Sequence, residues 1–216
     1  MDTMWSPYGR LAFSKFTDEN ADKKNNGKLR YSCALYLPKN REGLRSLDNA
    51  GMTDAAAATV LKGVEEFKAT VQEAMKTEAP KNMKISKIFK DGDKYADDKV
   101  AEWELDNDED APDYLNSTKN MYILQLSTEF APKIVGPKMA AGELPTEEAY
   151  DGCWIRCLIR GYGWSYNGTK GWSLGLGGTV QKWQDAPAYG SASSADVEGE
   201  DAMELAPSAD ADDFID

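Results

Sequence analysis

Histidine is missing from this 216-residue chain. Its imidazole is the usual general base near neutral pH and a common zinc ligand. Without histidine the chain cannot build a Ser-His-Asp triad, a Cys-His pair or a zinc site with imidazole ligands. This absence favours a protein that catalyses no reaction.

Cysteine is scarce as well. The three cysteines, Cys33, Cys153 and Cys157, are an odd number and cannot form a framework of disulfides. In a strand, the spacing of Cys153 and Cys157 places both thiols on the same face. We therefore expect reduced, buried thiols and not a metal site.

The chain also lacks motifs that hold metals and cofactors. No glycine-rich loop ends in Lys-Ser or Lys-Thr, and Gly175, Gly177 and Gly178 follow a strand pattern with no helix pattern after it. The acidic run 106–110 lacks the central glycine and closing glutamate of a calcium loop, so we expect a solvated loop there. We expect neither a metal nor a cofactor.

Long apolar runs are absent. No stretch approaches the roughly 18 apolar residues of a membrane span. The first residues also lack the basic and apolar regions of a signal peptide. We expect a cytoplasmic protein.

Positive charge is missing from the end of the chain. Residues 183–216 hold ten acidic side chains and no lysine or arginine, among many alanines, serines and glycines. This composition offers too little apolar surface to offset the entropy lost on ordering. We expect one folded domain over residues 1–183 and a disordered acidic tail over residues 184–216.

The overall charge conceals a basic majority. The chain has 25 Lys and Arg against 37 Asp and Glu, a net charge of −12. Residues 97–113 contribute nine acids and one lysine, and outside this block and the tail 24 basic residues face 18 acidic ones. Most of the chain is mildly basic, which is compatible with a nucleic-acid partner.

Hydrophobic periodicity predicts several strands. Alternation marks residues 8–16, 29–37 and 121–127, and a shorter run at 85–89 is a further candidate. The polar loop between the first two strands carries lysines: Lys23, Lys24 and Lys28. These elements indicate a mainly β protein.

One long helix is expected between the strands. Thr53 can cap a helix that reaches about residue 77, with an apolar stripe of Val60, Val64, Phe67, Val71 and Met75. Residues 91–93, with the sequence Asp-Gly-Asp, are expected to form a turn. The acidic block 97–113 is expected to leave the sheet as an excursion.

The first strand of the last hairpin has two different faces. Its odd-numbered residues are apolar at the start: Cys153, Ile155, Cys157 and Ile159. Its even-numbered residues are mostly aromatic or cationic: Trp154, Arg156, Arg160, Tyr162, Trp164 and Tyr166. We expect the first set in the core and the second set on an open groove.

The return strand, residues 170–183, adds Lys170 and Trp172 after the turn signal at Asn167-Gly168. Arginines among aromatic rings are costly to bury without partners. They suit a groove that neutralises phosphates while bases stack on rings. The hairpin therefore predicts a surface for single-stranded nucleic acid, although the aromatics could also form the second inner face of a sandwich.

Five short motifs occur in a fixed order along the chain: residues 9–13, 28–39, 91–93, 150–153 and 171–181. Together they resemble phage single-stranded DNA-binding proteins with an OB-fold, a family long described only as a domain of unknown function. The resemblance extends from about residue 8 to residue 183. It implies an elaborated OB-type antiparallel barrel with helices that binds DNA without sequence preference.

The resemblance also implies that the acidic tail recruits replication or recombination proteins. The tail residues in question are Asp210, Asp212, Asp213, Phe214 and Asp216. Tails of replication single-strand binders usually finish in a terminal phenylalanine, whereas here two residues follow Phe214. The sequence is compatible with a homo-oligomer and does not determine the oligomeric state.

The sequence thus predicts a single-stranded DNA-binding protein of phage-like replication or recombination, which protects single strands. A β-sandwich virion or carbohydrate-binding module is the main alternative. Such a module would expose Trp and Tyr, but it gives no reason for Arg156, Arg160 and Lys170 among them. A metal-dependent nuclease that uses the acids of residues 97–113 is a weaker alternative, because that block has no partner lysine or histidine in a recognisable spacing.

Overall fold

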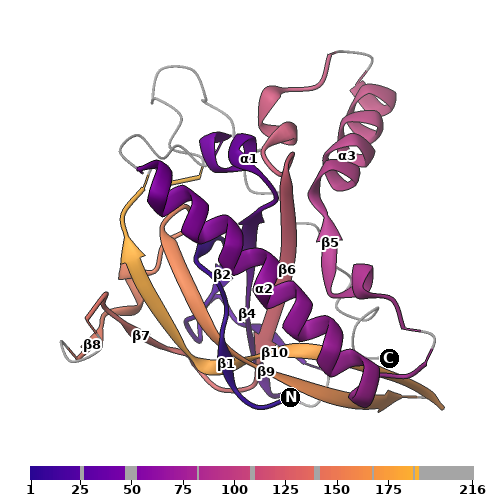
Figure 1. Cartoon of the computed structure of the whole chain (residues 1–216), viewed down its shortest axis with the longest axis vertical. Helices are drawn as coiled ribbons and strands as arrows, with labels where there is room; N and C mark the ends of the chain where they lie inside the picture. Colours follow the sequence, from indigo (N-terminus) through magenta and orange to yellow (C-terminus); the bar gives the residue numbers. More distant parts are fainter. Residues whose placement is uncertain are drawn as a thin grey trace.

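One curved sheet of ten strands organises the molecule (Figure 1). The structure is a computed structural model, and it describes residues 1–24, 27–46, 53–81, 83–107, 110–138, 142–166, 168–186 and 188–189. The strands are β1 (Met4–Trp5), β2 (Gly9–Lys15), β3 (Asp22–Lys23), β4 (Leu29–Pro38), β5 (Phe89–Asp91), β6 (Met121–Thr128), β7 (Lys133–Val135), β8 (Glu143–Leu144), β9 (Trp154–Tyr166) and β10 (Thr169–Gln184). The helices are α1 (Arg41–Ser46), α2 (Asp54–Glu78) and α3 (Gly92–Asn107), with short 3₁₀ turns at Ile85–Lys87, Asp113–Asn116 and Thr146–Glu148.

The strand order is β5-β6-β4-β2-β9-β10-β7-β8, with β1 pairing along β9 and β3 along β4. The pairs are antiparallel except for β10 with β7. The sheet curls until β10 approaches β6, where a Cβ atom at Gly175 would lie 3.5 Å from the carbonyl oxygen of Ser127. This is the elaborated OB-type barrel, mainly β with helices, that the resemblance implied.

Helix α2 fills the curve of the sheet and confirms the predicted helix. Thr53 caps it by accepting a hydrogen bond from the Ala56 backbone N–H, and its five buried residues are the predicted apolar stripe. Most of the stripe packs into the main core with side chains such as Leu35 and Ile155. In Figure 1, α2 runs diagonally across the strands.

A second core lies on the other face of the same strands. It contains Ala12, Ala34, Tyr36, Leu44, Val60, Met121, Ile123 and Trp154. Strand β4 is therefore buried on both faces, with Cys33 and Leu35 on one side and Ala34 and Tyr36 on the other. This second core buries Trp154, one of the residues that were expected on the open groove.

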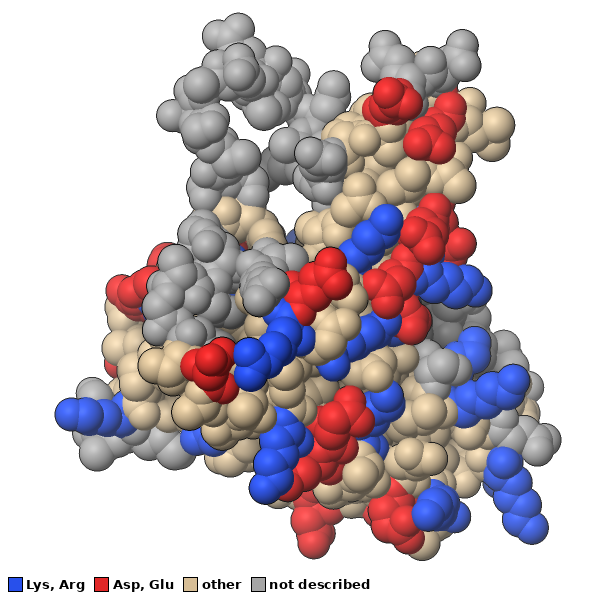
Figure 2. All heavy atoms as spheres, turned by 45° about the horizontal axis from the view of Figure 1, so that its top comes forward, with Lys and Arg blue, Asp and Glu red and all other residues tan. Residues whose placement is uncertain are grey.

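The predictions for residues 85–113 are partly wrong. A strand was expected over residues 85–89, but a 3₁₀ turn occupies Ile85–Lys87 and the strand β5 begins only at Phe89. Asp-Gly-Asp is not a free turn, because Asp91 accepts hydrogen bonds from the N–H groups of Asp93 and Lys94 and so begins α3. Most of the acidic block is therefore helical, and Figure 2 shows acidic side chains following this helix at the upper right.

Contacts with the folded domain continue beyond the boundary predicted at residue 183. Asp185 accepts a hydrogen bond from the Tyr150 hydroxyl, and the Tyr189 ring lies 5.9 Å from the Tyr36 ring. The Arg10 guanidinium lies 5.1 Å from the centre of the Tyr189 ring. Residues 190–216, which include the predicted partner-binding residues Asp210, Asp212, Asp213, Phe214 and Asp216, lie outside the described part of the chain.

Within the described ranges, no helix is both long enough and apolar enough to cross a membrane.

Candidate nucleic-acid interface

The predicted hairpin is present as β9 and β10. The two strands pair antiparallel from Thr169 opposite Tyr166 to Gln184 opposite Trp154, with irregularities between Leu176 and Val180 and near the far end. Gly168 adopts a left-handed φ of 82°, which glycine accommodates without strain. Asn167 and the Tyr166 side chain lie outside what the structure describes, so the prediction for Tyr166 stays a prediction.

The core-facing half of the alternation is confirmed. Cys153, Ile155, Cys157 and Ile159 are all fully buried. Burial raises the pKa of the Cys153 thiol to about 12. Contact with the Cys33 thiol and burial raise the pKa of Cys157 well above its usual value. These thiols are neutral core residues.

Trp154 does not face an open groove, so that prediction is wrong. Its side chain is fully buried in the second core, with its ring centre 6.0 Å from that of Trp183. The alternation places Trp154 on the expected face, but at this end of β9 helices and neighbouring aromatic rings cover that face. The alternative of a second inner face is correct for this residue.

Trp172 is also buried, and the reason is the register of the hairpin. Trp172 lies opposite Gly163, so it shares the odd-numbered, core-facing side of β9. Its ring occupies space above Gly161, where a Cβ atom would lie 2.3 Å from the ring. Its Nε1 donates a 3.0 Å hydrogen bond to Glu78. The prediction that Trp172 lines the groove is wrong.

Arg156 is held by other groups of the protein. Its Nε donates a 2.6 Å hydrogen bond to the Gln181 side-chain oxygen, and its guanidinium lies 4.7 Å from the Trp5 ring centre and 5.0 Å from that of Tyr8. The side chain is half-buried. The N-terminal segment therefore covers the position that was expected to be an open cationic site.

The other end of the same face is open. A cavity of about 360 Å³ lies where β10 approaches β6. Its lining consists of Lys24, Arg30, Ser127, Thr128, Glu129, Arg160, Tyr162, Trp164, Ser165 and Gly175. We call this cavity the groove. The structure thus brings three predicted residues, Arg160, Tyr162 and Trp164, together on one surface.

Two glycines let the aromatic rings of the groove lie against β10. A Cβ atom at Gly171 would lie 2.0 Å from the Trp164 ring, and one at Gly175 would lie 3.0 Å from the Tyr162 ring. Trp164 is further fixed by a 3.0 Å hydrogen bond from its Nε1 to the Ser173 hydroxyl. Tyr162 is 40% exposed. The rings are held in place and still reach solvent, as base stacking requires.

The cations of the groove differ in how they are paired. Arg30 is 3.1 Å from Asp22, which also pairs with Lys15. Lys24 is 3.1 Å from Glu129. Arg160 is exposed and has no ion-pair partner among the residues that the structure describes. It is the groove cation most available to an external anion.

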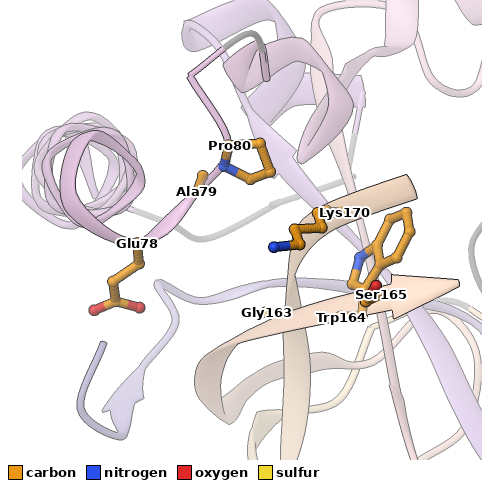
Figure 3. Close-up of a pocket in the computed structure, with 8 residues that line it drawn as sticks. Glu78, Ala79, Pro80, Gly163, Trp164, Ser165 and Lys170 are labelled. Carbon is orange, nitrogen blue, oxygen red and sulfur yellow. The ribbon is translucent and has the colours of Figure 1, made fainter. Parts of the chain in front are cut away.

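Lys170 lies apart from the groove. It pairs opposite Ser165, at an exposed position near the turn of the hairpin, and lines a hollow of about 470 Å³ beside the end of α2 (Figure 3). Glu78 and Pro80 form the other wall, while Trp164 and Ser165 line both the hollow and the groove. Lys170 is exposed and points into this hollow in Figure 3.

Sequence reasoning missed half of the groove. Arg30 comes from β4, and Ser127, Thr128 and Glu129 come from the end of β6 and the residue after it; both strands were predicted from their alternation, but neither was expected at the site. The lysine-rich loop was noticed, but nothing in the sequence connected it to the hairpin. Phe130, next to Glu129, was also missed, and its side chain is 71% exposed.

A model of one protein family matches residues 8–215. The family is described as Enterobacter phage Enc34, ssDNA-binding protein. This chain belongs to that family. The match covers the groove, the hairpin and almost all of the acidic tail.

Solved structures of the Enc34 protein share the fold. Its complex with single-stranded DNA has a TM-score of 0.53 at 18% identity, covering 87% of this chain and 89% of that chain. A C-terminal truncation of the same phage protein has a TM-score of 0.54 at 17% identity, covering 86% and 87%. No curated protein sequence matches this chain.

Proposed function

We propose that this chain binds single-stranded DNA in the groove between β9, β10 and the end of β6, and that it catalyses no reaction. One observation carries the proposal: an exposed arginine without an ion-pair partner in the described structure stands beside two supported aromatic rings. Family membership and the phage protein solved with single-stranded DNA support it.

In this proposal Arg160 contacts a backbone phosphate, and Arg30 and Lys24 extend the cationic wall. Bases stack on Tyr162 and Trp164, at about 1 to 3 kcal/mol per base. Every base presents a flat ring surface, so binding tolerates sequence. The exposed Phe130, which follows the groove residue Glu129 in the chain, is an additional stacking candidate.

The biological role that fits is protection of single strands during phage-like replication or recombination in the host cytoplasm. Bound DNA cannot re-pair and is shielded from nucleases. We further propose that the acidic C-terminal tail recruits replication or recombination proteins. Its composition supports this role.

Titration of the protein with oligo(dT) at several salt concentrations tests the binding proposal. Arg160→Ala should make log affinity less steep in log salt by roughly 0.7, the value of one phosphate contact to a single strand. Tyr162→Ala should weaken binding by about 1 to 3 kcal/mol with little change in slope, because a ring releases no counterions.

Arg41→Ala is the matched control. It removes an exposed arginine that pairs with Asp54 on α2, outside the groove lining. It should leave both affinity and salt slope nearly unchanged. If the folded protein does not bind oligo(dT), or if Arg160→Ala behaves like Arg41→Ala, the groove is not the binding site.

A further inference from the structure

The groove contains an anion of its own. Glu129 stands at the end of β6, and its two carboxylate oxygens contact two different ammonium groups. Oε1 is 3.1 Å from Lys24 Nζ, and Oε2 is 3.0 Å from Lys28 Nζ. One carboxylate thus binds Lys24, which lines the groove, and Lys28, which lies next to the groove lining, beside the end of β6.

This arrangement resembles the way a phosphate is held. The two non-bridging oxygens of a backbone phosphate can accept from two ammonium groups in the same manner as the two oxygens of Glu129. Glu129 is also the one acidic residue among the ten that line the groove. The two lysines keep the pKa of Glu129 below its usual value, so it is ionised at neutral pH.

Glu129 differs from the other acidic partner of a groove cation. Asp22 pairs with Arg30 but is not among the residues that line the groove. Glu129 lines the groove itself, and its side chain is 39% exposed. An incoming DNA strand would meet the carboxylate of Glu129 and would not meet that of Asp22.

We propose that Glu129 is a built-in phosphate mimic that holds Lys24 and Lys28 until a backbone phosphate displaces it. This inference rests on the proposed binding of single-stranded DNA in the groove. It distinguishes two classes of cation. Arg160 can bind a phosphate at once, whereas Lys24 and Lys28 can bind one only after the phosphate has displaced Glu129. Glu129 therefore lowers affinity and makes binding selective for strands that supply a phosphate at that position.

Glu129→Gln tests the proposal, because it removes the charge and keeps the size. It should tighten binding of oligo(dT) about fivefold at low salt, the factor that corresponds to about 1 kcal/mol between unit charges 4 Å apart in water. The gain should shrink as salt screens the charge. Glu73→Gln is the control, since Glu73 pairs with Lys76 on the exposed side of α2 and should change affinity little.

A double-mutant cycle separates displacement from simple repulsion. If Glu129 occupies Lys24, then Lys24→Gln costs less affinity in the wild-type protein than in the Glu129→Gln variant. Simple repulsion predicts equal costs in both backgrounds. Thermal melts of all variants establish that each is folded.

The outcomes are distinct. Tighter binding by Glu129→Gln together with unequal costs of Lys24→Gln supports the inference. Unchanged or weaker binding by Glu129→Gln, or equal costs, overturns it while Arg160→Ala still reports on the groove. Absence of oligo(dT) binding by the unmodified protein overturns the proposed function and this inference with it.

Discussion

The two halves of β9 follow the same alternation but differ in what covers them. In the first half Trp154 is fully buried and Arg156 is held by Trp5, Tyr8 and Gln181. In the second half Arg160 and Tyr162 reach solvent on the same face. The strand changes from a core element to a binding surface along its length.

The difference shows that alternation assigns a face and does not assign exposure. A tryptophan next to an arginine on a strand has the same sequence signature whether the face is covered or open. Coverage of the first half comes from segments distant in the sequence, namely the N-terminal residues and the second core. None of these covering residues lines the groove at the second half.

The largest expected effect concerns the two tryptophans of β9. Trp154→Ala should lower the free energy of unfolding by about 3 to 5 kcal/mol, as removal of a large buried ring does. Trp164→Ala should cost much less stability, because that ring is half-exposed, and should instead weaken oligo(dT) binding. Urea denaturation measures the first effect and titration the second. Equal losses of stability in the two variants would contradict the division of β9.

The next largest effect should distinguish the two arginines of β9, one by its loss of binding and the other by its loss of stability. Arg160→Ala should cost about 1.5 to 3 kcal/mol of binding, the usual contribution of a hydrogen bond to a charged group. Arg156→Ala should lower stability through loss of its ring and Gln181 contacts while leaving the salt slope of binding unchanged. The slope of log affinity against log salt, measured between about 50 and 200 mM salt, distinguishes the two variants. A reduced slope in Arg156→Ala would place Arg156 in the DNA site after all.

A smaller effect is expected at Gly171. A methyl group there would lie 2.0 Å from the Trp164 ring, so Gly171→Ala should displace the ring and keep the rest of the hairpin. We expect a loss of about 1 kcal/mol in binding, the lower end of one stacking contact. Gly163→Ala is the control, because its Cβ would be 3.8 Å from its nearest neighbour. Equal binding by both variants would show that the position of Trp164 does not matter.

The smallest expected effect concerns the accessibility of Cys153. Burial raises the pKa of Cys153 to about 12, so at pH 8 this thiol is neutral as well as inaccessible and should not react with a thiol reagent. A cysteine introduced by Ser165→Cys, on the exposed half of β9, should react at the rate of an ordinary surface thiol. Fast labelling of the unmodified native protein would show that the first half opens readily.

Much of the fold could be predicted because local patterns and burial agree. The stripe on α2 has helical spacing and its members are buried, and Ile155, Cys157 and Ile159 alternate along the first half of β9 and are buried. Helix α3 was missed because Asp-Gly-Asp is typical of a turn and the acids that follow carry almost no apolar periodicity. Asp91 acts there as a helix cap, which depends on how the backbone leaves β5.

The amino-acid sequence by itself determined which residues alternate, which stripe α2 buries and that the hairpin mixes rings with cations. The tertiary structure decided which of those side chains reach solvent. Register placed Trp172 opposite Gly163 and therefore in the core, and the N-terminal segment covered Arg156. Curling of the sheet brought Lys24, Arg30 and Glu129 to Arg160. These outcomes depend on contacts between segments far apart in the chain, which no local period encodes.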